Sequence, residues 1–177
     1  VNQAERGIKV AFGAVVDGNL QPGPTFSLPE PLGEIVRVST AQRSVLIDRA
    51  FVPATYRADR PLDQQGLGGQ EIDPGRDGSL ITGDGQLAHA SVAATYRVED
   101  PSAFVRNVHP DEEQALIESV IRRATIIAVA TTTIDDLLAR GVVREGEAGG
   151  RESSLERTIR DNAQRTLDAM DAGVTVD

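Results

Sequence analysis

The clearest pattern in the chain is the regular alternation of apolar and polar positions over residues 87–98. This two-residue period is typical of a half-buried strand. The face that should line the core holds Ala88, Ala90, Val92, Ala94, Tyr96 and Val98, and the opposite face holds Leu87, His89, Ser91, Ala93, Thr95 and Arg97. The pattern predicts one long strand that begins after a tight turn at Gly83–Gly85.

Shorter strands are predicted on the amino-terminal side of this element. Apolar side chains occupy every second position of Ile8–Phe12, and Asp17–Asn19 should then turn the chain. Two further strand patterns, Ile35–Val38 and Ser44–Ile47, are separated by a length that suits a hairpin. We therefore expect a meander of antiparallel strands.

Two long amphipathic helices are predicted in the carboxy-terminal half. The first should begin at Asp111–Glu113, where three carboxylates suit the positive end of a helix dipole. Its expected apolar stripe consists of Leu116, Val120, Ala124 and Ile127. The second should begin at the capping box Ser153–Glu156. Its expected stripe consists of Leu155, Ile159, Ala163, Leu167 and Met170.

Smaller elements complete the prediction. A short helix is expected over Ser102–Asn107. Thr131–Thr133 should interrupt the first long helix because β-branched residues weaken helices, and it offers an N-cap for a helix over Ile134–Ala139. Gly173 suits the left-handed position at the end of the last helix, and Val174–Val176 should form a closing strand.

Two stretches lack periodicity and are predicted to be loops or insertions. Residues 49–79 are rich in glycine and proline, and residues 141–151 form a second, shorter break. The remaining elements predict an α+β fold, in which a bent antiparallel β-sheet packs against amphipathic helices. We expect residues 1–177 to form one domain, because this length supports a single core.

Composition narrows the classes of function. The chain has a formal net charge of −9 and Lys9 is its one lysine, which argues against a nucleic-acid partner. It has no cysteine, so a disulfide framework and a thiolate zinc site are excluded. The longest uninterrupted apolar run, Ile126–Ala130, is far shorter than the roughly 18 residues that a membrane-spanning helix needs.

Several residue types could carry chemistry, but each has a simpler structural interpretation. His89 and His109 are separated by twenty positions and have no shared pattern with other ligand-type residues. Glu112–Glu113 and Asp135–Asp136 could form a hydrolytic carboxylate pair, yet acids at helix starts are stabilising in any case. Ser44 and Ser91 lack a base in a useful sequence context.

Two loop motifs are equally weak. Asp73–Gly78 is similar to part of a calcium loop but lacks the intervening oxygen ligand and the closing glutamate. Gly66–Gly69 has no following Lys-Ser or Lys-Thr, so it does not match a phosphate-binding loop. We therefore predict no catalytic residue, no cofactor-binding residue, no metal ligand and no cofactor.

Two separated blocks of sequence resemble one known family. The first block carries Asn2, Gln3, Glu5, Arg6, Gly7, Phe12, Gly13, Leu20, Pro22, Gly23, Leu28 and Pro29. Prolines in Leu20–Gly23 and Leu28–Pro31 favour extended connectors here. The second block is Leu80–Asp84, followed by the alternating strand that ends at Pro101. In this order the blocks resemble the SPFH, band 7 or prohibitin-homology family, which includes stomatins and the HflK and HflC modulators of a membrane protease.

The resemblance, closest to the HflK/HflC type, implies a non-enzymatic scaffold. Its expected partners are copies of itself, a related SPFH protein, an ATP-dependent membrane protease and membrane lipid. It implies a single-pass, membrane-anchored bacterial protein with this domain on the extracytoplasmic, periplasmic face. The anchor and a coiled coil would lie outside residues 1–177, so we expect this sequence to be a fragment that forms a monomer or weak oligomer alone.

Two alternatives stay open at this stage. A stomatin-like organiser of membrane domains would keep the fold and serve another client. An independent hydrolase or ligand-binding domain would instead use a pocket under the loop at residues 49–79.

Overall fold

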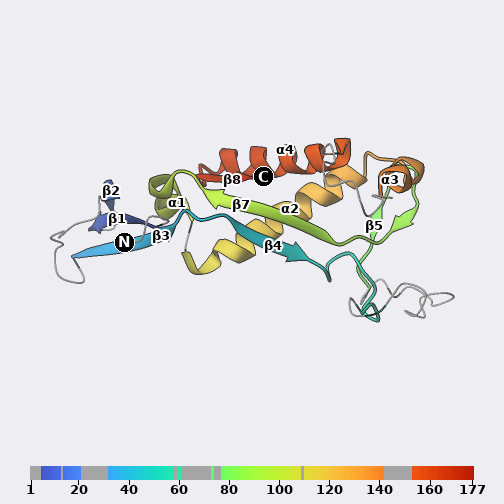
Figure 1. Cartoon of the computed structure of the whole chain (residues 1–177), viewed down its shortest axis with the longest axis horizontal. Helices are drawn as coiled ribbons and strands as arrows, with labels where there is room; N and C mark the ends of the chain where they lie inside the picture. The colour runs from blue at the N-terminus through green and yellow to red at the C-terminus, as the bar shows by residue number, and fades with distance from the viewer. Residues whose placement is uncertain are drawn as a thin grey trace. The chain divides into compact units, whose positions relative to one another are not determined.

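The computed structural model describes residues 5–12, 14–20, 32–57, 60, 73, 77–108, 110–141 and 153–177. The chain divides into two compact units, each built from separate stretches of sequence. Unit 1 consists of Val1–Val45, Ala94–Val120 and Ala163–Asp177, and unit 2 consists of Leu46–Ala93 and Ile121–Asn162. The expected α+β fold is confirmed, with antiparallel sheets packed against helices. The described strands are divided among three sheets (Figure 1).

The first sheet lies in unit 1 and has the order β2-β1-β3. It is built from β1 (Glu5–Ala11), β2 (Ala14–Leu20) and β3 (Gly33–Ser39). β1 pairs antiparallel with β3 along its whole length, from Glu5 opposite Ser39 to Ala11 opposite Gly33. The helix α1 (Pro101–Asn107) packs against these strands, as Figure 1 shows.

The predicted turn at Asp17–Asn19 is wrong. Ala11 pairs with Ala14, so the chain turns between them, and Phe12 takes a positive φ of 53°. Asp17 lies within β2, where two register shifts show that the strand absorbs extra residues as bulges. Turn-forming residues are also favourable in bulges, which explains the error. Gly13 and residues 21–31, with the predicted proline connectors, lie outside the described residues.

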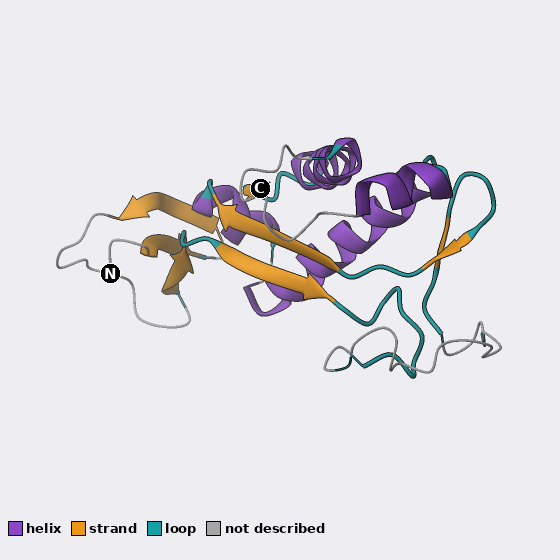
Figure 2. Ribbon diagram, turned by 45° about the vertical axis from the view of Figure 1, so that its right-hand side comes forward, coloured by secondary structure: helices purple, strands orange, loops and turns teal. Residues whose placement is uncertain are grey.

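The second sheet has the order β4-β7-β8 and uses β4 (Arg43–Ile47), β7 (Val92–Val98) and β8 (Val174–Val176). Figure 2 shows β4 and β7 as adjacent strands. The predicted hairpin between Ile35–Val38 and Ser44–Ile47 is therefore wrong, because β3 pairs with β1 and β4 pairs with β7. A short connection permits hairpin pairing but does not impose it when other strands offer longer ladders.

The predicted long strand is confirmed in its two faces and corrected in its length. It is broken into β6 (Leu87–Ala88) and β7, with no strand over residues 89–91. Tyr96 and Val98 are buried, whereas Arg97 is exposed. The alternation therefore identified the core-facing side correctly, although the predicted strand is divided into β6 and β7.

The closing strand β8 is an edge strand whose free side is covered. The α4 residue Gln164 accepts a hydrogen bond from the Val176 amide at 3.0 Å and donates to the Val174 carbonyl at 3.1 Å. Such coverage protects an edge from pairing with another chain. Gly173 has the predicted left-handed conformation, with φ of 65°, and its carbonyl accepts from the amides of Glu99 and Asp100.

The helices begin close to the predicted positions. Helix α1 is capped by Asp100, whose carboxylate accepts from the amides of Ser102 and Ala103. The short 3-10 helix η2 (Pro110–Glu112) leads into α2 (Glu113–Val129). Helix α4 (Ser154–Ala169) begins at the predicted capping box, in which Ser153 and Glu156 exchange hydrogen bonds of 2.7 and 3.1 Å.

The buried stripes differ in part from the prediction. In α2 the stripe consists of Ile117, Val120, Ile121, Ala124 and Ala128, whereas Leu116 is half-buried and Ile127 is exposed. Leu116 and Ile127 are eleven positions apart, about three turns of a helix, so both lie on the same edge of the buried stripe rather than at its centre. In α4, Ala163 and Leu167 are buried, but Met170 follows the helix end and is exposed.

Unit 2 contains a small hairpin and a short helix. Strands β5 (Leu80–Ile81) and β6 pair antiparallel, and the predicted turn lies between them. Helix α3 (Ile134–Gly141) follows the predicted break. The described part of residues 49–79 contains no helix or strand, and β5 begins directly after this range. Residues 142–152, which cover nearly all of the second predicted loop, lie outside the described residues.

Candidate functional site

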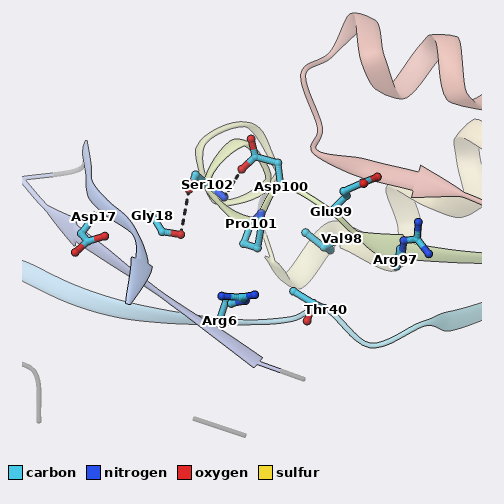
Figure 3. A pocket seen from close by; sticks show the side chains of 10 residues that line it. All are labelled: Arg6, Asp17, Gly18, Thr40, Arg97, Val98, Glu99, Asp100, Pro101 and Ser102. Carbon is cyan, nitrogen blue, oxygen red and sulfur yellow. Dashed lines mark hydrogen bonds between the residues drawn. The ribbon is translucent and has the colours of Figure 1, made fainter. Parts of the chain in front are cut away.

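A polar hollow of about 740 Å³ lies in unit 1, where β7 leads into α1 (Figure 3). Its charged lining consists of Arg6, Asp17, Arg97, Glu99 and Asp100. Both signs of charge are present, so the hollow offers no uniform field for an anion or a cation.

Three of the polar residues around the hollow, Glu99, Asp100 and Ser102, make hydrogen bonds within the fold. Asp100 caps α1, and the Ser102 hydroxyl donates to the Gly18 carbonyl at 3.3 Å (Figure 3). The Glu99 carboxylate accepts from the Thr175 hydroxyl at 2.6 Å. A nucleophile needs an adjacent activating base, and Ser102 instead faces a backbone carbonyl. Ser102 and Asp100 thus have structural hydrogen bonds in this hollow.

A second polar cluster in unit 1 is partly buried. Arg43 Nη1 on β4 lies 2.7 Å from Glu113 Oε2 at the start of α2. Arg43 Nη2 also donates to the Ser39 carbonyl, and the guanidinium lies 5.4 Å from the centre of the Tyr96 ring. The exposed fraction is 33% for the Arg43 side chain and 11% for that of Glu113. A charge that is so little exposed needs a partner, which Arg43 supplies.

The pKa of Tyr96 reflects the environment of the Arg43–Glu113 pair. Burial raises the pKa of its hydroxyl, and the negative charge of Glu113 raises the pKa further. Two atoms of the ion pair, Arg43 Nε and Glu113 Oε1, are buried without a hydrogen-bond partner among the described residues. The cluster therefore resembles a structural ion pair with incompletely satisfied groups.

The sequence placed Glu113 at a helix start but missed this pairing. Arg43 is 70 positions away, so no local rule connects the two residues. One signal was present: Glu113 precedes Ile117 by four positions and so continues the buried stripe of α2. A carboxylate on the core side of an amphipathic helix is costly to bury unless a cation on a neighbouring element pairs with it.

The histidine candidates do not meet in the described structure. His89 is exposed, and its Nδ1 lies 3.3 Å from the Phe51 carbonyl and 3.1 Å from the Gly78 carbonyl. A carbonyl only accepts, so Nδ1 carries the proton and donates. The ring thereby links the two ends of the predicted loop. His109 lies outside the described residues.

The calcium-like motif also closes this loop. The Asp77 carboxylate accepts from the Ala54 amide at 2.8 Å and from the Asp73 amide at 2.9 Å. Both oxygens are thus used by backbone donors, which supports the structural interpretation. Gly66–Gly69 lies outside the described residues.

The carboxylates at the start of α3 are exposed and belong to a helix-capping arrangement. The Thr133 hydroxyl accepts from the Asp136 amide, as expected for the predicted N-cap. Asp84, in the β5–β6 turn, accepts from the Ile134 amide at 3.2 and 3.3 Å. The Thr82 hydroxyl donates to Asp84 at 2.6 Å, which lowers the pKa of Asp84 below 3.8, and the Ile134 amide acts in the same direction.

The candidate carboxylates Glu112–Glu113 and Asp135–Asp136 belong to different units of the described chain. Glu113 is paired with Arg43, whereas Asp135 and Asp136 remain at the surface of α3. The described residues contain no group of three or more His, Asp or Glu side chains placed to hold a metal ion. Within the same ranges, no helix combines the length and apolar character needed to cross a bilayer.

Comparison with protein families decides the class of this molecule. The family model described as SPFH domain / Band 7 family matches residues 1–177. The chain belongs to the SPFH/Band 7 family. A comparison with curated proteins gives no match. Members of the SPFH family are generally non-catalytic scaffolds associated with membranes.

Two sets of exposed apolar side chains stand out among those of this SPFH domain. In unit 1, Phe12, Val16 and Leu32 are 75%, 63% and 45% exposed, and the Phe12 amide donates to the Leu32 carbonyl at 3.0 Å. We call these three residues the amino-terminal tip. In unit 2, Ile126, Ile127 and Leu138 are 48%, 44% and 59% exposed at the end of α2 and on α3. Contiguous exposed apolar patches mark contact surfaces, so these residues are candidates for such contacts.

Proposed function

We propose that this SPFH domain is the assembly domain of a non-enzymatic, membrane-anchored scaffold of the HflK/HflC type. The anchored protein oligomerises with copies of itself and with a related SPFH protein, and the assembly modulates an ATP-dependent membrane protease. The family match over residues 1–177 is the observation that carries this proposal. The resemblance of the two sequence blocks to the HflK/HflC type is the reason for proposing a membrane protease as the regulated partner.

Tethering provides the physical basis for assembly. A net charge of −9 opposes close packing of free copies in solution. Anchors that hold many copies in one plane raise their effective concentration, so individually weak contacts become sufficient. The isolated chain should therefore be a monomer or weak oligomer, and the anchored protein a large particle.

The amino-terminal tip suits a position close to lipid. Phe12, Val16 and Leu32 are apolar and exposed, and an anchor upstream of residue 1 would hold this end of the chain near the bilayer. An apolar group at the membrane interface gains from leaving water. In this proposal the domain lies on the extracytoplasmic side, in a bacterial protein with a single membrane span.

The decisive experiment is affinity isolation of the full-length protein from gently solubilised native membranes, followed by sizing and mass spectrometry. An unrelated membrane protein with the same tag is the control for nonspecific capture. We expect a very large particle that contains a related SPFH chain and an ATP-dependent membrane protease. A large particle without protease would contradict the modulator role and favour a stomatin-like organiser.

The enzyme alternative has its own test. Combined replacement of His89, His109 and Asp135 by alanine should abolish no hydrolytic activity, because, of the described candidates, His89 serves loop closure and Asp135 lies on the surface of a helix. Loss of a hydrolytic activity without unfolding would contradict the scaffold proposal.

A further inference from the structure

Two helices of unit 2 each carry exposed apolar side chains beside an exposed charge, and the two charges have opposite signs. On α2, Arg123, Ile126 and Ile127 are exposed at spacings of three and four residues, so they share one side of the helix. The core-facing residues Ala124 and Ala128 are buried. The second half of α2 therefore has a buried side and a distinct outward side that is basic and apolar.

The next helix carries the opposite charge. On α3, Asp135 and Leu138 are exposed and three positions apart, so they share one side of that helix. Asp136 is also exposed, but it lies two positions from Leu138 and so faces a different way. The outward side of α3 is therefore acidic and apolar.

We propose that these two patches join neighbouring copies of this chain. The basic patch of one copy, Arg123 with Ile126 and Ile127, binds the acidic patch of the next copy, Asp135 with Leu138. This inference rests on the proposed scaffold function and assigns the surface by which it assembles. Within one copy, exposures of 44–59% for the three apolar side chains show that the patches do not bury each other.

Charge complementarity selects a second copy as the occupant. Each chain carries both halves of the match, so one sequence supplies both partners. An anionic lipid surface would be repelled by the acidic patch. A contact between two different patches is also heterologous, so it passes from copy to copy and closes into a ring when the rotation permits. Tethering in a membrane compensates for the small size of each patch.

Disulfide cross-linking in the full-length protein tests this contact directly. Residues 1–177 contain no cysteine, so each introduced cysteine is the single thiol of its domain. Copies with Ile127→Cys and one tag are co-expressed in native membranes with Leu138→Cys copies that carry another tag. Oxidation should join the two tags at least about tenfold more than in the control pair of Leu46→Cys with Leu138→Cys, because specific contacts fix register. Leu46 is 60% exposed, which makes it a matched surface position.

Charge reversal provides the second measurement. Arg123→Glu and Asp135→Arg should each reduce the 127–138 cross-link by about tenfold, and the double variant should recover it, because repulsion becomes attraction again. Asp136→Arg is the control, since it places the same change in the same helical turn on another side.

The outcomes separate this inference from the proposed function. Large particles with no 127–138 cross-link, or with silent charge reversals, would overturn this interface and leave the scaffold intact. A wild-type protein that forms no large particle in its native membranes would overturn the scaffold proposal, and the interface with it.

Discussion

The two units differ in the burial and pairing of selected charged side chains. In unit 1, Arg43 and Glu113 are drawn together into a partly buried pair beside Tyr96. In unit 2, Arg123 and Asp135 remain exposed next to apolar side chains that are also exposed. A charge that is paired inside its own chain contributes to the fold. An exposed charge next to an exposed apolar group has little value to the isolated fold and is available for a partner.

This contrast predicts that changes in the two units have separable effects. Substitutions at the paired charges should lower the free energy of unfolding, whereas substitutions at the α2–α3 patches should weaken assembly. The predictions that follow test the contrast at comparable positions in the two units.

Two glycines with positive φ should differ most. Gly173 in unit 1 has φ of 65°, and a Cβ at this position would collide with the Asp100 carbonyl. Gly85 in unit 2 has φ of 78° with open space around it. Gly173→Ala should cost about 3 kcal/mol from backbone strain and overpacking together, whereas Gly85→Ala should cost about 1 kcal/mol from strain alone. Urea denaturation measures both, and equal losses would refute the importance of the Asp100 contact.

Loss of the buried carboxylate should have the next largest effect. Glu113→Ala leaves Arg43 without its counter-ion and should cost about 2 kcal/mol, less than in a fully buried pair because a third of the Arg43 side chain is exposed. The exposed neighbour Glu112 is the control, and Glu112→Ala should change stability by less than about 0.5 kcal/mol. If urea midpoints fall equally in both variants, the ion pair is not the source of the stability.

The capping box in unit 2 should have a smaller effect. Ser153→Ala removes the hydroxyl that accepts from the Glu156 amide and should cost about 1 kcal/mol. Amide hydrogen exchange should show faster opening in the first turn of α4 than in the second half of that helix. Uniformly faster exchange along α4 would argue against a local cap.

The smallest effect concerns pH. The folded pKa of Asp84 is lowered, chiefly by the Thr82 hydroxyl, so its ionised form stabilises the fold above pH 3.8, and this contribution disappears as pH falls through the lowered pKa. The difference in urea midpoint between wild type and Asp84→Asn should therefore shrink as pH falls from about 6 to about 3. Thr82→Val should move the loss to higher pH. A difference that does not change with pH would contradict the linkage.

Features set by neighbouring residues could be predicted from the sequence. The capping box, the left-handed Gly173 and the buried side of β7 depend on spacing within a few positions, and all three are confirmed. Long-range pairing could not be predicted in this way. The ladder between β1 and β3 and the contact between Arg43 and Glu113 join distant stretches of chain.

Apolar character was also an incomplete guide to burial. Phe12 continues the alternation that begins at Ile8, yet Ile8 is fully buried and Phe12 is 75% exposed. The reason is that the chain turns after Ala11, so the strand ends before Phe12. Ile127 is a second example: the predicted stripe of α2 includes it, yet its side chain is 44% exposed and contributes to the proposed interface. Phe12 and Ile127 therefore enter the proposals on membrane and partner contact, although the pattern alone predicted both to be buried.

The most direct test of the contrast between the units measures unfolding and assembly in the same two variants. Urea midpoints of the chain and particle sizes of the anchored protein are compared for Glu113→Ala and Arg123→Glu. We predict that Glu113→Ala lowers the midpoint while its folded fraction still assembles, and that Arg123→Glu keeps the wild-type midpoint but forms much smaller particles. A lowered midpoint with wild-type particle size for Arg123→Glu would contradict the assignment of the exposed charges to assembly.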